Sequence, residues 1–364
     1  MRTNKCTLLI DGNWLLMSRF SVMDNNFELT QSDLTKQMAQ QNLQELMAKS
    51  ISIILNRFPF IDNVILVTDG GSWRKQLPIP KQLENTTYKG NRVKESTHDW
   101  KYIYGALTDL SARCKELGMT VSNHTMIEGD DWIWYWTRRL NENGVSTVIW
   151  SSDNDLKQLI QNDSFNGSIT AWYNDRNGVW FDDSLQEKPM DDLDFFMQPL
   201  KVKMPILESL KQYSKEASFI IPDSIAMEKI ICGDSGDNIK PVVRTTGGTR
   251  TYKISVKMWN DIKADLGITN IDEFFKNKEN IINRILNIKK FSNCDYNDIS
   301  EMFDYNIKLV WLNESVIPET VIMYMNQLDY NLIDVNYIKS NFKVMCSQEN
   351  EIEEIFDSIE NLPF

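Results

Sequence analysis

Five separate segments of this 364-residue chain place aspartate or glutamate where an expected strand ends or an expected helix begins. These acids are Asp11, Asp69, the cluster of Glu128, Asp130 and Asp131, the pair Asp153 and Asp155, and the pair Asp234 and Asp237. Carboxylate oxygens are the ligands that Mg²⁺ and Mn²⁺ prefer, and hydrolases that work with paired metal ions need several carboxylates at one place. The chain has two histidines, His98 and His124, and neither lies in these clusters, so a serine–histidine or histidine-based hydrolase is not indicated.

Each acid also has a purely structural interpretation. Asp11 and Asp69 could cap turns after strands, and acidic residues near helix N-termini are favoured by the helix dipole. The cluster at residues 128–131 is harder to explain in this way, because three acids within four residues repel one another unless solvent or cations screen them. The joint placement of all five groups favours a metal site, centred on residues 127–160, in which the strand at 145–151 separates two acidic clusters.

The elements that would position these acids alternate along the chain. Apolar, β-branched runs predict strands at residues 6–10, 63–68, 119–124, 145–151 and 168–173. Helical spacing predicts helices at 33–58 and 99–117, and two more that open at the cluster 128–131 and at Asp153. This order is typical of an α/β fold with a mostly parallel central sheet covered by helices, whose sites lie outside the carboxyl ends of the strands.

Residues 72–98 change in character from the sheet elements around them. Cations, including Arg74, Lys75, Lys89 and Arg92, are interleaved there with aromatic residues such as Tyr88. One interpretation is a solvated loop. The other is a mobile basic arch over a polyanion, in which cations meet phosphates and aromatic rings stack on bases.

A second basic region follows a helix expected at residues 222–232 and a polar turn at 233–238. Residues 238–258 contain no acid and carry five cations, namely Lys240, Arg244, Arg250, Lys253 and Lys257. This pattern predicts a hairpin between helices that grips a nucleic-acid backbone, a helix–hairpin–helix-type element at about 233–264. We therefore expect an α/β core at 1–221, with the arch at 72–98, and a helical C-terminal domain at 222–364.

Bulk composition sets further limits. The net charge of −12 argues against a generic polyanion binder, although local charge decides what a binding face attracts. Five scattered cysteines predict a reducing compartment, and no apolar run is long enough for a signal or a membrane span, so we expect a cytoplasmic monomer. The acidic, amphipathic stretch at 349–360 either docks on a basic groove of a partner or packs on its own domain.

Taken together, these motifs resemble the flap endonuclease/5′-nuclease superfamily. The resemblance rests on Asp11, on Asp69 with Arg74, on Glu128-x-Asp130-Asp131, on Asp153-x-Asp155 and on Asp234-x-x-Asp237. The segments 88–92, 95–100 and 306–331 are more narrowly similar to the ribonuclease H (5′→3′ exonuclease) branch of T-even-type bacteriophages. The resemblance covers most of the chain.

The resemblance implies a PIN-like core and an Mg²⁺-dependent 5′→3′ nuclease with two metal ions, for which Mn²⁺ can substitute. The enzyme would remove RNA primers and 5′ DNA flaps during lagging-strand synthesis, in the host cytoplasm if the gene is a phage's. A sliding clamp or a single-strand-binding protein is a candidate partner. By position, Asp11, Asp69, Asp130 and Asp153 would hold one metal, while Glu128, Asp155, Asp234 and Asp237 would serve the second directly or through water. Asp131 would coordinate a metal ion directly or contact a residue that coordinates one. Lys89 and Arg92 would contact the scissile phosphate.

Departures from the family and two rival functions remain. Gly129 stands where the family has alanine, a change expected to be harmless, and the hairpin lacks the glycine-rich pattern that binds potassium in cellular members. The region 182–220 has no counterpart in the resemblance.

A catalytically silent, structure-specific DNA-binding protein is one rival. A metal-dependent phosphatase is the other, although Asp11-Gly12-Asn13 lacks the second aspartate of an aspartyl-phosphate mechanism.

Overall fold

The chain folds into two compact units in a computed structural model. The structure describes residues 5–83, 86–92, 97–160, 162–163, 168–174, 179–181, 187–189, 221–247 and 250–345. The first unit comprises Met1–Gly71, Glu95–Ile220 and Tyr324–Phe364, and the second comprises Ser72–Lys94 and Ile221–Met323. The second unit thus begins its main part at the predicted domain boundary. It also takes in most of the predicted basic arch, and residues 324 onward return to the first unit.

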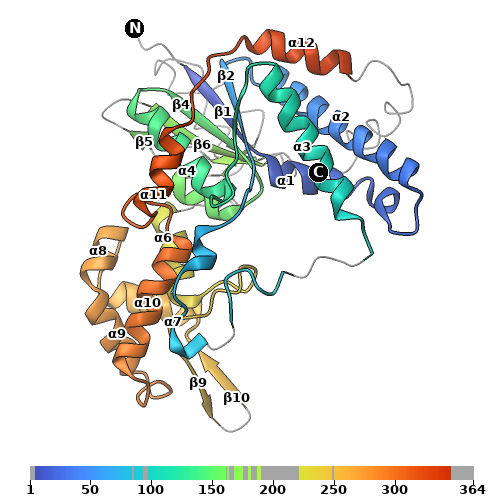
Figure 1. Cartoon of the computed structure of the whole chain (residues 1–364). Coiled ribbons are helices and arrows are strands. Elements are labelled where there is room, and N and C mark those ends of the chain that lie inside the picture. Colours follow the sequence, from blue (N-terminus) through green and yellow to red (C-terminus); the bar gives the residue numbers. More distant parts are fainter. Residues whose placement is uncertain are drawn as a thin grey trace. The chain divides into compact units, whose positions relative to one another are not determined.

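The first unit is built on a mostly parallel sheet, as the alternating pattern predicts (Figure 1). Its strands within the described residues run in the order β3-β2-β1-β4-β6-β7-β8, with β5 paired to β6. The five parallel strands are β1 (Cys6–Asp11), β2 (Asn63–Val67), β3 (Thr120–Ser122), β4 (Ser146–Trp150) and β6 (Ser168–Asn174). The antiparallel additions are β5 (Asn162–Asp163), β7 (Val179–Phe181) and β8 (Glu187–Pro189).

The register of the parallel strands brings their carboxyl ends to one edge. Ile10 lies opposite Leu66 on one side and Trp150 on the other, so β1, β2 and β4 end almost level. Asp11 is the last residue of β1, and Gly12 directly after it allows close approach to β2, because a Cβ there would lie 2.7 Å from the carbonyl oxygen of Val67. This edge is where the predicted site has to lie.

Helices cover both faces of this sheet. Alternate strand residues such as Leu8 and Ile10 join one core cluster with α2 (Asp33–Arg57), α3 (Trp100–Glu116) and α12 (Val335–Met345), which lie side by side. The helix α4 (Gly129–Glu142) contacts β1, β2, β4 and β6 and buries Trp132 and Trp136. The short α1 (Gly12–Phe20) and the 3-10 helix η1 (Asp24–Phe27) complete the unit.

The prediction of an α-helix that opens at Asp153 is wrong in the type of helix. The structure has instead a 3-10 helix, η4 (Asn154–Leu159), and the chain is extended again at Ile160. The carboxylate of Asp153 still caps the segment, because it accepts a hydrogen bond from the amide of Asp155. The six residues that follow are a short connector between β4 and β5, and 3-10 helices are frequent as connectors.

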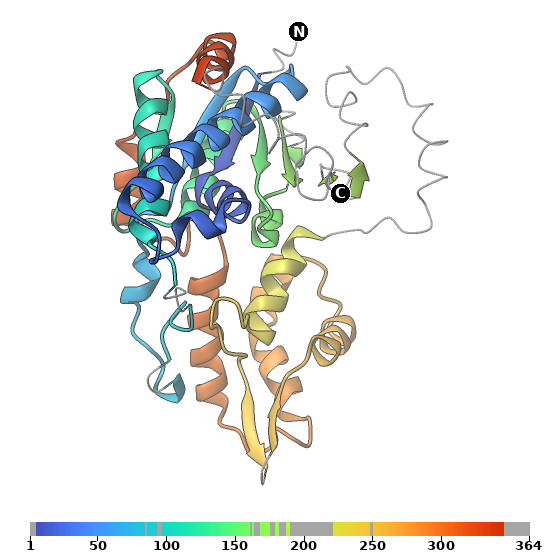
Figure 2. The same cartoon turned by 90° about the vertical axis from the view of Figure 1, so that its right-hand side faces the viewer.

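The second unit is helical and carries one β-hairpin. Its elements are η2 (Trp73–Gln76), η3 (Lys81–Leu83), α6 (Pro222–Cys232), β9 (Arg244–Gly247), β10 (Arg250–Lys253), α7 (Val256–Asp265), α8 (Ile271–Lys276), α9 (Lys278–Leu286), α10 (Tyr296–Val310) and α11 (Glu319–Asn326), the last of which ends in the first unit. Ile230, Trp259, Phe274 and Phe303 are buried in its core. The predicted hairpin is therefore present, and its strands extend away from the helices (Figure 2).

Several predictions concern segments outside the described residues. These are the region 182–220 apart from β8, the C-terminal stretch 349–360, and the side chain of Arg250. Among the residues that the structure does describe, no helix has the length and apolar character needed to cross a membrane.

Candidate metal centre and basic surfaces

Asp11 lies at the centre of the sheet edge, at the end of the middle strand β1. Its Oδ1 accepts a hydrogen bond from the amide of Trp14 at 3.0 Å and so caps helix α1. Its Oδ2 accepts a second hydrogen bond from the hydroxyl of Ser151, at the end of β4, at 2.7 Å. The structural interpretation of Asp11 as a cap is therefore correct, but capping uses only one of its two oxygens.

The electrostatic environment of Asp11 differs from that of an ordinary capping residue. Burial, opposed by the hydrogen bonds from Trp14 and Ser151 but reinforced by the charges of Asp69 and Asp153, raises the pKa of Asp11 to about 7. A carboxyl group whose neighbours are also carboxylates is stabilised in its charged form when a cation binds among them. Asp11 thus interacts with two of the acids predicted to share a metal with it.

Asp69 lies two residues beyond β2 and is exposed. Its Oδ1 accepts a hydrogen bond from the amide of Gly129 at 2.6 Å, which ties the end of β2 to the start of α4. A Cβ on Gly129 would lie 3.0 Å from this oxygen, so the alanine usual in the family would oblige the carboxylate of Asp69 to shift by a few tenths of an ångström. An exposed side chain can move by that amount, so the expectation that glycine here is harmless stays a prediction.

The acidic cluster forms the N-terminus of α4. Glu128 and Asp131 are buried, whereas Asp130 is half-buried. Asp131 Oδ2 accepts a hydrogen bond from the amide of Glu128 at 3.4 Å, which fastens the first turn of the helix. The positive end of the helix dipole stabilises these carboxylates, and the same dipole accounts for part of their placement without any metal.

The pair Asp153 and Asp155 follows β4 in the turn that begins η4. Asp153 is exposed, and its Oδ1 accepts a hydrogen bond from the amide of Asp155 at 2.8 Å. The carbonyl of Asp153 accepts a hydrogen bond from the indole of the buried Trp172 on β6 at 3.1 Å. The aromatic interior thus fixes the backbone of this turn, while the carboxylate of Asp153 remains at the surface.

Three polar residues that the sequence did not single out hold these acids in place. Ser151 donates to Asp11 and accepts from the amide of Asp153 at 3.0 Å, so one hydroxyl links two predicted ligands. Asn13 accepts from the amide of Asp69 at 2.9 Å, and Asn123 donates to its carbonyl at 3.2 Å. Each of the three follows a strand directly or within two residues, a position that could have drawn attention to them.

The chemistry of this edge fits a divalent cation. The donors are carboxylates from the ends of β1, β2 and β4 and from the start of α4, which are hard oxygen ligands of the kind that Mg²⁺ and Mn²⁺ take. Within the described residues, no group of three histidine, cysteine, aspartate or glutamate side chains is already close enough to hold one ion. Asp69 and Asp153 each act electrostatically on Asp11, and repulsion of this kind is relieved by a bound cation.

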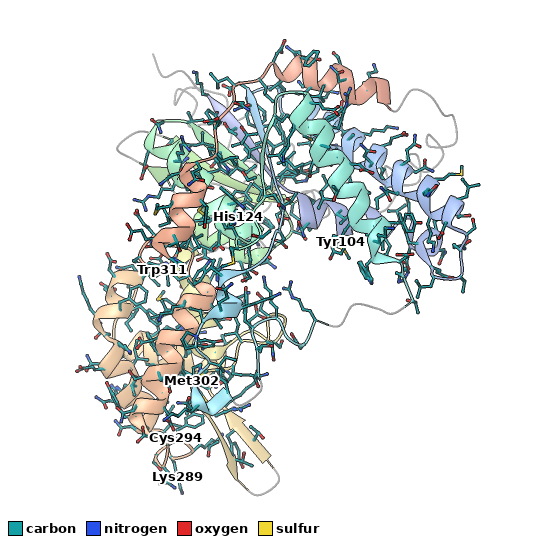
Figure 3. All side chains as sticks on the ribbon, in the orientation of Figure 1. Tyr104, His124, Lys289, Cys294, Met302 and Trp311 are labelled. Atoms are coloured by element: carbon teal, nitrogen blue, oxygen red, sulfur yellow. The ribbon has the colours of Figure 1, made fainter. Side chains whose placement is uncertain are left out.

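Both histidines have side-chain partners within the first unit. His98 Nε2 lies 2.6 Å from Asp24 Oδ1. His124, labelled in Figure 3, lies on the loop that follows β3. Its ring stacks on the ring of Tyr324, and the two ring centroids are 4.5 Å apart. That neither histidine is a catalytic base stays a prediction.

Asp234 and Asp237 belong to the second unit, in the turn after α6. Asp234 Oδ2 lies 2.5 Å from Lys229 Nζ, and its Oδ1 accepts from the amide of Gly236 at 2.8 Å. Burial acts to raise the pKa of Asp234, but the hydrogen bond and charge of Lys229, together with backbone amides, outweigh it and lower the pKa below its usual value. The metal roles predicted for Asp234 and Asp237 stay predictions.

Two cations of the predicted arch, Lys89 and Arg92, are paired within the second unit. Arg92 forms an ion pair with Asp237, and Lys89 Nζ lies 3.8 Å from the same carboxylate. Tyr88 is buried, and its ring lies under Lys89 Nζ at 4.9 Å. Residues 87–92 are therefore anchored within the second unit although most of them are exposed, and both interpretations of the segment stay predictions.

The remaining basic residues differ in their exposure. Arg74 is only 2% exposed and its guanidinium lies over the ring of Trp73, a burial that does not favour its predicted contact with nucleic acid. Lys75 is exposed. On and beside the hairpin, Arg244, Lys253 and Lys257 are exposed, and Lys240 donates to the Asn238 side chain at 2.6 Å.

Solved structures with a similar fold span nearly the whole chain. The bacteriophage T5 D15 protein co-crystallised with metal ions matches with a TM-score of 0.53 and 16% identity, over 92% of this chain and 100% of that chain. A pseudo-enzyme-product complex of the T5 D15 flap endonuclease with DNA and metal ions matches with a TM-score of 0.53 and 14% identity, over 94% and 100%. At this identity the likeness concerns the fold.

Sequence comparison identifies the family. No curated protein sequence matches the chain significantly. The family model that does match is described as the 5′-3′ exonuclease, N-terminal resolvase-like domain, and it covers residues 6–188. Those residues include all the strands of the sheet up to β7 and every acid of the first unit discussed above. Because this match extends over half of the chain, the protein belongs to the 5′-3′ exonuclease family and is a nuclease.

Proposed function

We propose that the protein is an Mg²⁺-dependent 5′→3′ nuclease of the ribonuclease H and flap endonuclease type. It hydrolyses phosphodiesters to remove RNA primers, and adjacent DNA or 5′ flaps, during lagging-strand DNA replication. The observation that carries the proposal is the placement of Asp11 between Asp69 and Asp153 at the carboxyl edge of the sheet, where both acids act electrostatically on Asp11. The fold shared with the T5 D15 flap endonuclease, solved with DNA and metal ions, supports it.

Two Mg²⁺ ions, replaceable by Mn²⁺, are the cofactors in this proposal. Asp11, Asp69, Asp130 and Asp153 would hold one ion, and Glu128, Asp155, Asp234 and Asp237 would serve the other. The ions would supply an activated water and stabilise the attacking and leaving oxygens of an in-line displacement. Within the protein, Ser151 holds Asp11 by its hydroxyl, and Gly129 holds Asp69 by its amide.

The hairpin supplies the proposed DNA-binding face. Arg244 lies directly opposite Lys253 in the β9–β10 pair, and both are exposed. Like charges directly opposite each other destabilise a strand pair. Residues 238–258 contribute no acid of their own to offset this repulsion, and an anion bound from outside would relieve it. A phosphate backbone, bound without reading the bases, provides such anions in a row.

We expect the double variant Lys253→Ala/Lys257→Ala to bind duplex DNA more weakly and with a flatter salt dependence. Each phosphate contact that is lost removes about one released counterion, so the slope of log K against log [salt] should fall in magnitude by up to about 1.8. Fluorescence anisotropy with a labelled duplex in Ca²⁺, from 50 to 200 mM salt, measures this slope.

The matched control for this variant is Lys276→Ala/Lys308→Ala. It removes the same charge from exposed lysines on α8 and α10. The control should leave the slope close to that of the parent protein. Equal slopes for the parent and the hairpin variant would show that the binding face lies elsewhere.

The proposed activity is tested by cleavage of three labelled substrates in Mg²⁺. A 5′ flap, a nicked duplex and an RNA–DNA hybrid with a free 5′ end should all be cut from the 5′ side, and EDTA should stop the reaction. Binding without Mg²⁺-dependent cleavage of any of them would favour the alternative, a catalytically silent, structure-specific DNA-binding protein.

The setting of the reaction is also part of the proposal. We infer a monomer acting in the cytoplasm, that of the host cell if the gene is a phage's. A single-strand-binding protein or a sliding clamp is the candidate partner in this role.

A further inference from the structure

The β9–β10 hairpin of the second unit has two different faces. Arg244 lies opposite Lys253, and the neighbouring pair on the ladder is Thr245 and Tyr252. Because successive residues of a strand point to opposite sides, the first pair lies on one face and Tyr252 on the other. Arg244 and Lys253 are exposed, whereas Tyr252 is half-buried and packs against the helical core of this unit. The face with Tyr252 is therefore the one next to the helices.

The loop between α9 and α10, residues 287–295, brings a cation to the face of Tyr252. Lys290 Nζ lies over the ring of Tyr252, 5.2 Å from its centroid, where the ring quadrupole attracts it. Lys289, labelled in Figure 3, directly precedes it, and both lysines are exposed. The hairpin thus has Arg244 and Lys253 on one face, and Lys290 with its neighbour Lys289 beside the other.

The backbone of this loop is held by its own hydrogen bonds and by one buried ring. Phe291, directly after the two lysines, is fully buried in the helical core. Its amide donates to the carbonyl of Ile288 at 2.7 Å, and its carbonyl accepts from the amide of Cys294 at 2.9 Å. The hydroxyl of Ser292 donates to the carbonyl of Lys289 at 3.2 Å. The two lysines are therefore presented from an anchored loop.

These two lysines also differ from nearby cations in their electrostatic environment. On α9, Lys278 Nζ lies 2.5 Å from Asp304 Oδ1, and Arg284 lies 3.6 Å from Asp265. No such ion pair joins either loop lysine to an acid in the part of the chain that the structure describes. The acid nearest to them in sequence, Asp295, caps α10, where two backbone amides donate to its Oδ1. The loop lysines are therefore available to an anion from outside.

We propose that the β9–β10 hairpin occupies the major groove of the bound duplex, and that its two faces contact the phosphate backbones on the two sides of that groove. The inference rests on the proposed function, and it adds Lys289 and Lys290 as a second backbone contact. The major groove, about 12 Å wide, admits a two-stranded β-ribbon and is bordered by a phosphate row on each side. Contacts to phosphates alone require no particular base sequence.

A duplex fits this arrangement better than an acidic protein surface does. The hairpin projects from the helices, and its cations lie on both sides of the projecting ribbon (Figure 2). A flat acidic surface can meet one side of such a ribbon, whereas the two borders of a groove meet both sides at once.

The variants Lys289→Ala/Lys290→Ala and Arg244→Ala/Lys253→Ala test the two faces separately, and the quadruple variant tests them together. For a labelled blunt duplex in Ca²⁺, each double variant should reduce the magnitude of the slope of log K against log [salt] by up to about 1.8. The quadruple variant should reduce it by up to about 3.6, because contacts with two different backbones are independent and their losses add.

Two controls and a second ligand make the assignment specific. Lys289→Arg/Lys290→Arg keeps both charges and should keep the slope of the parent, and so should Lys276→Ala/Lys308→Ala, which removes exposed lysines elsewhere in the unit. A single strand of the same length has one backbone and no groove. On that ligand the quadruple variant should lose no more slope than Arg244→Ala/Lys253→Ala does alone.

An unchanged duplex slope in Lys289→Ala/Lys290→Ala would overturn the proposal, since the loop lysines would then contact no backbone. Equal losses of slope on duplex and single strand would also overturn it, because they would indicate one backbone and no groove. All of these measurements are of binding in Ca²⁺ and require no cleavage. A failure of this inference can therefore be told apart from a failure of the proposed nuclease activity, which is measured by cleavage in Mg²⁺.

Discussion

Asp11→Asn should lose at least about a hundredfold in Mg²⁺-dependent cleavage and, at the same time, make the metal-free protein more stable above pH 7. The activity falls because an amide is a poor ligand for Mg²⁺, and metal ions supply several kcal/mol of transition-state stabilisation. The stability rises because the carboxylate of Asp11 is costly in the folded state, where burial raises its pKa to about 7. An amide avoids this cost and can still accept the hydrogen bond from Trp14.

The direction of the stability effect follows from the two pKa values. The folded state holds the Asp11 proton more tightly than the unfolded state, whose pKa lies near 3.8. Protonated Asp11 therefore contributes its full stabilisation of the folded state below about pH 4. This contribution is lost as the pH rises through about 7, and the free energy of unfolding falls by up to about 4 kcal/mol. Asp11→Asn should accordingly gain stability relative to the parent at pH 8, and much less at pH 4.5.

Urea unfolding in EDTA at pH 4.5 and pH 8 measures this difference. The exposed Asp272 at the start of α8 is the matched position, and Asp272→Asn should keep nuclease activity and show no comparable gain at pH 8. A stability difference between Asp11→Asn and the parent that is the same at both pH values would refute the electrostatic account of Asp11.

The Mg²⁺ requirement of the enzyme should rise as the pH falls below about 7. Mg²⁺ binds the ionised carboxylate, so below its pKa the ion must displace a proton from Asp11. With one proton in competition, the half-saturating Mg²⁺ concentration should increase up to about tenfold per pH unit below the pKa and level off above it.

Initial rates of flap cleavage over a range of Mg²⁺ concentrations at pH 6, 7 and 8 test this expectation. Binding of the same DNA in EDTA, measured at the same three pH values, is the control for effects on substrate affinity. A half-saturating Mg²⁺ concentration that is equal at pH 6 and pH 8 would mean that Asp11 does not take up a proton where the metal binds.

The sheet could be predicted from the sequence because its strands are buried on both faces. In β1, Leu8, Leu9 and Ile10 are all fully buried, which explains a continuous apolar run followed by an acid. The same reasoning placed Asp11, Asp69 and Asp153 at one edge, because parallel strands must present their carboxyl ends together. These inferences needed only local pattern and the geometry of parallel sheets.

The contacts that tune the site could not be predicted in the same way. Ser151 contacts Asp11 across 140 residues of sequence, and Arg92 reaches Asp237 across 145, so neither pairing leaves a local trace. Asp153 caps a helix, as the sequence predicts, but the six residues after it form a 3-10 connector between β4 and β5 instead of an α-helix. Long-range pairing and the length of such a connector are decided by the folded structure.

The central claim, that the acids at the sheet edge perform metal-dependent phosphodiester hydrolysis, is tested most directly on Asp131 and Asp155. Cleavage of a labelled 5′-flap DNA in Mg²⁺ is compared for the parent, Asp131→Asn and Asp155→Asn, with binding of the same DNA measured in Ca²⁺. We expect both variants to lose cleavage while their DNA affinity is retained. Full cleavage by both variants would contradict the assignment of this edge as the active site.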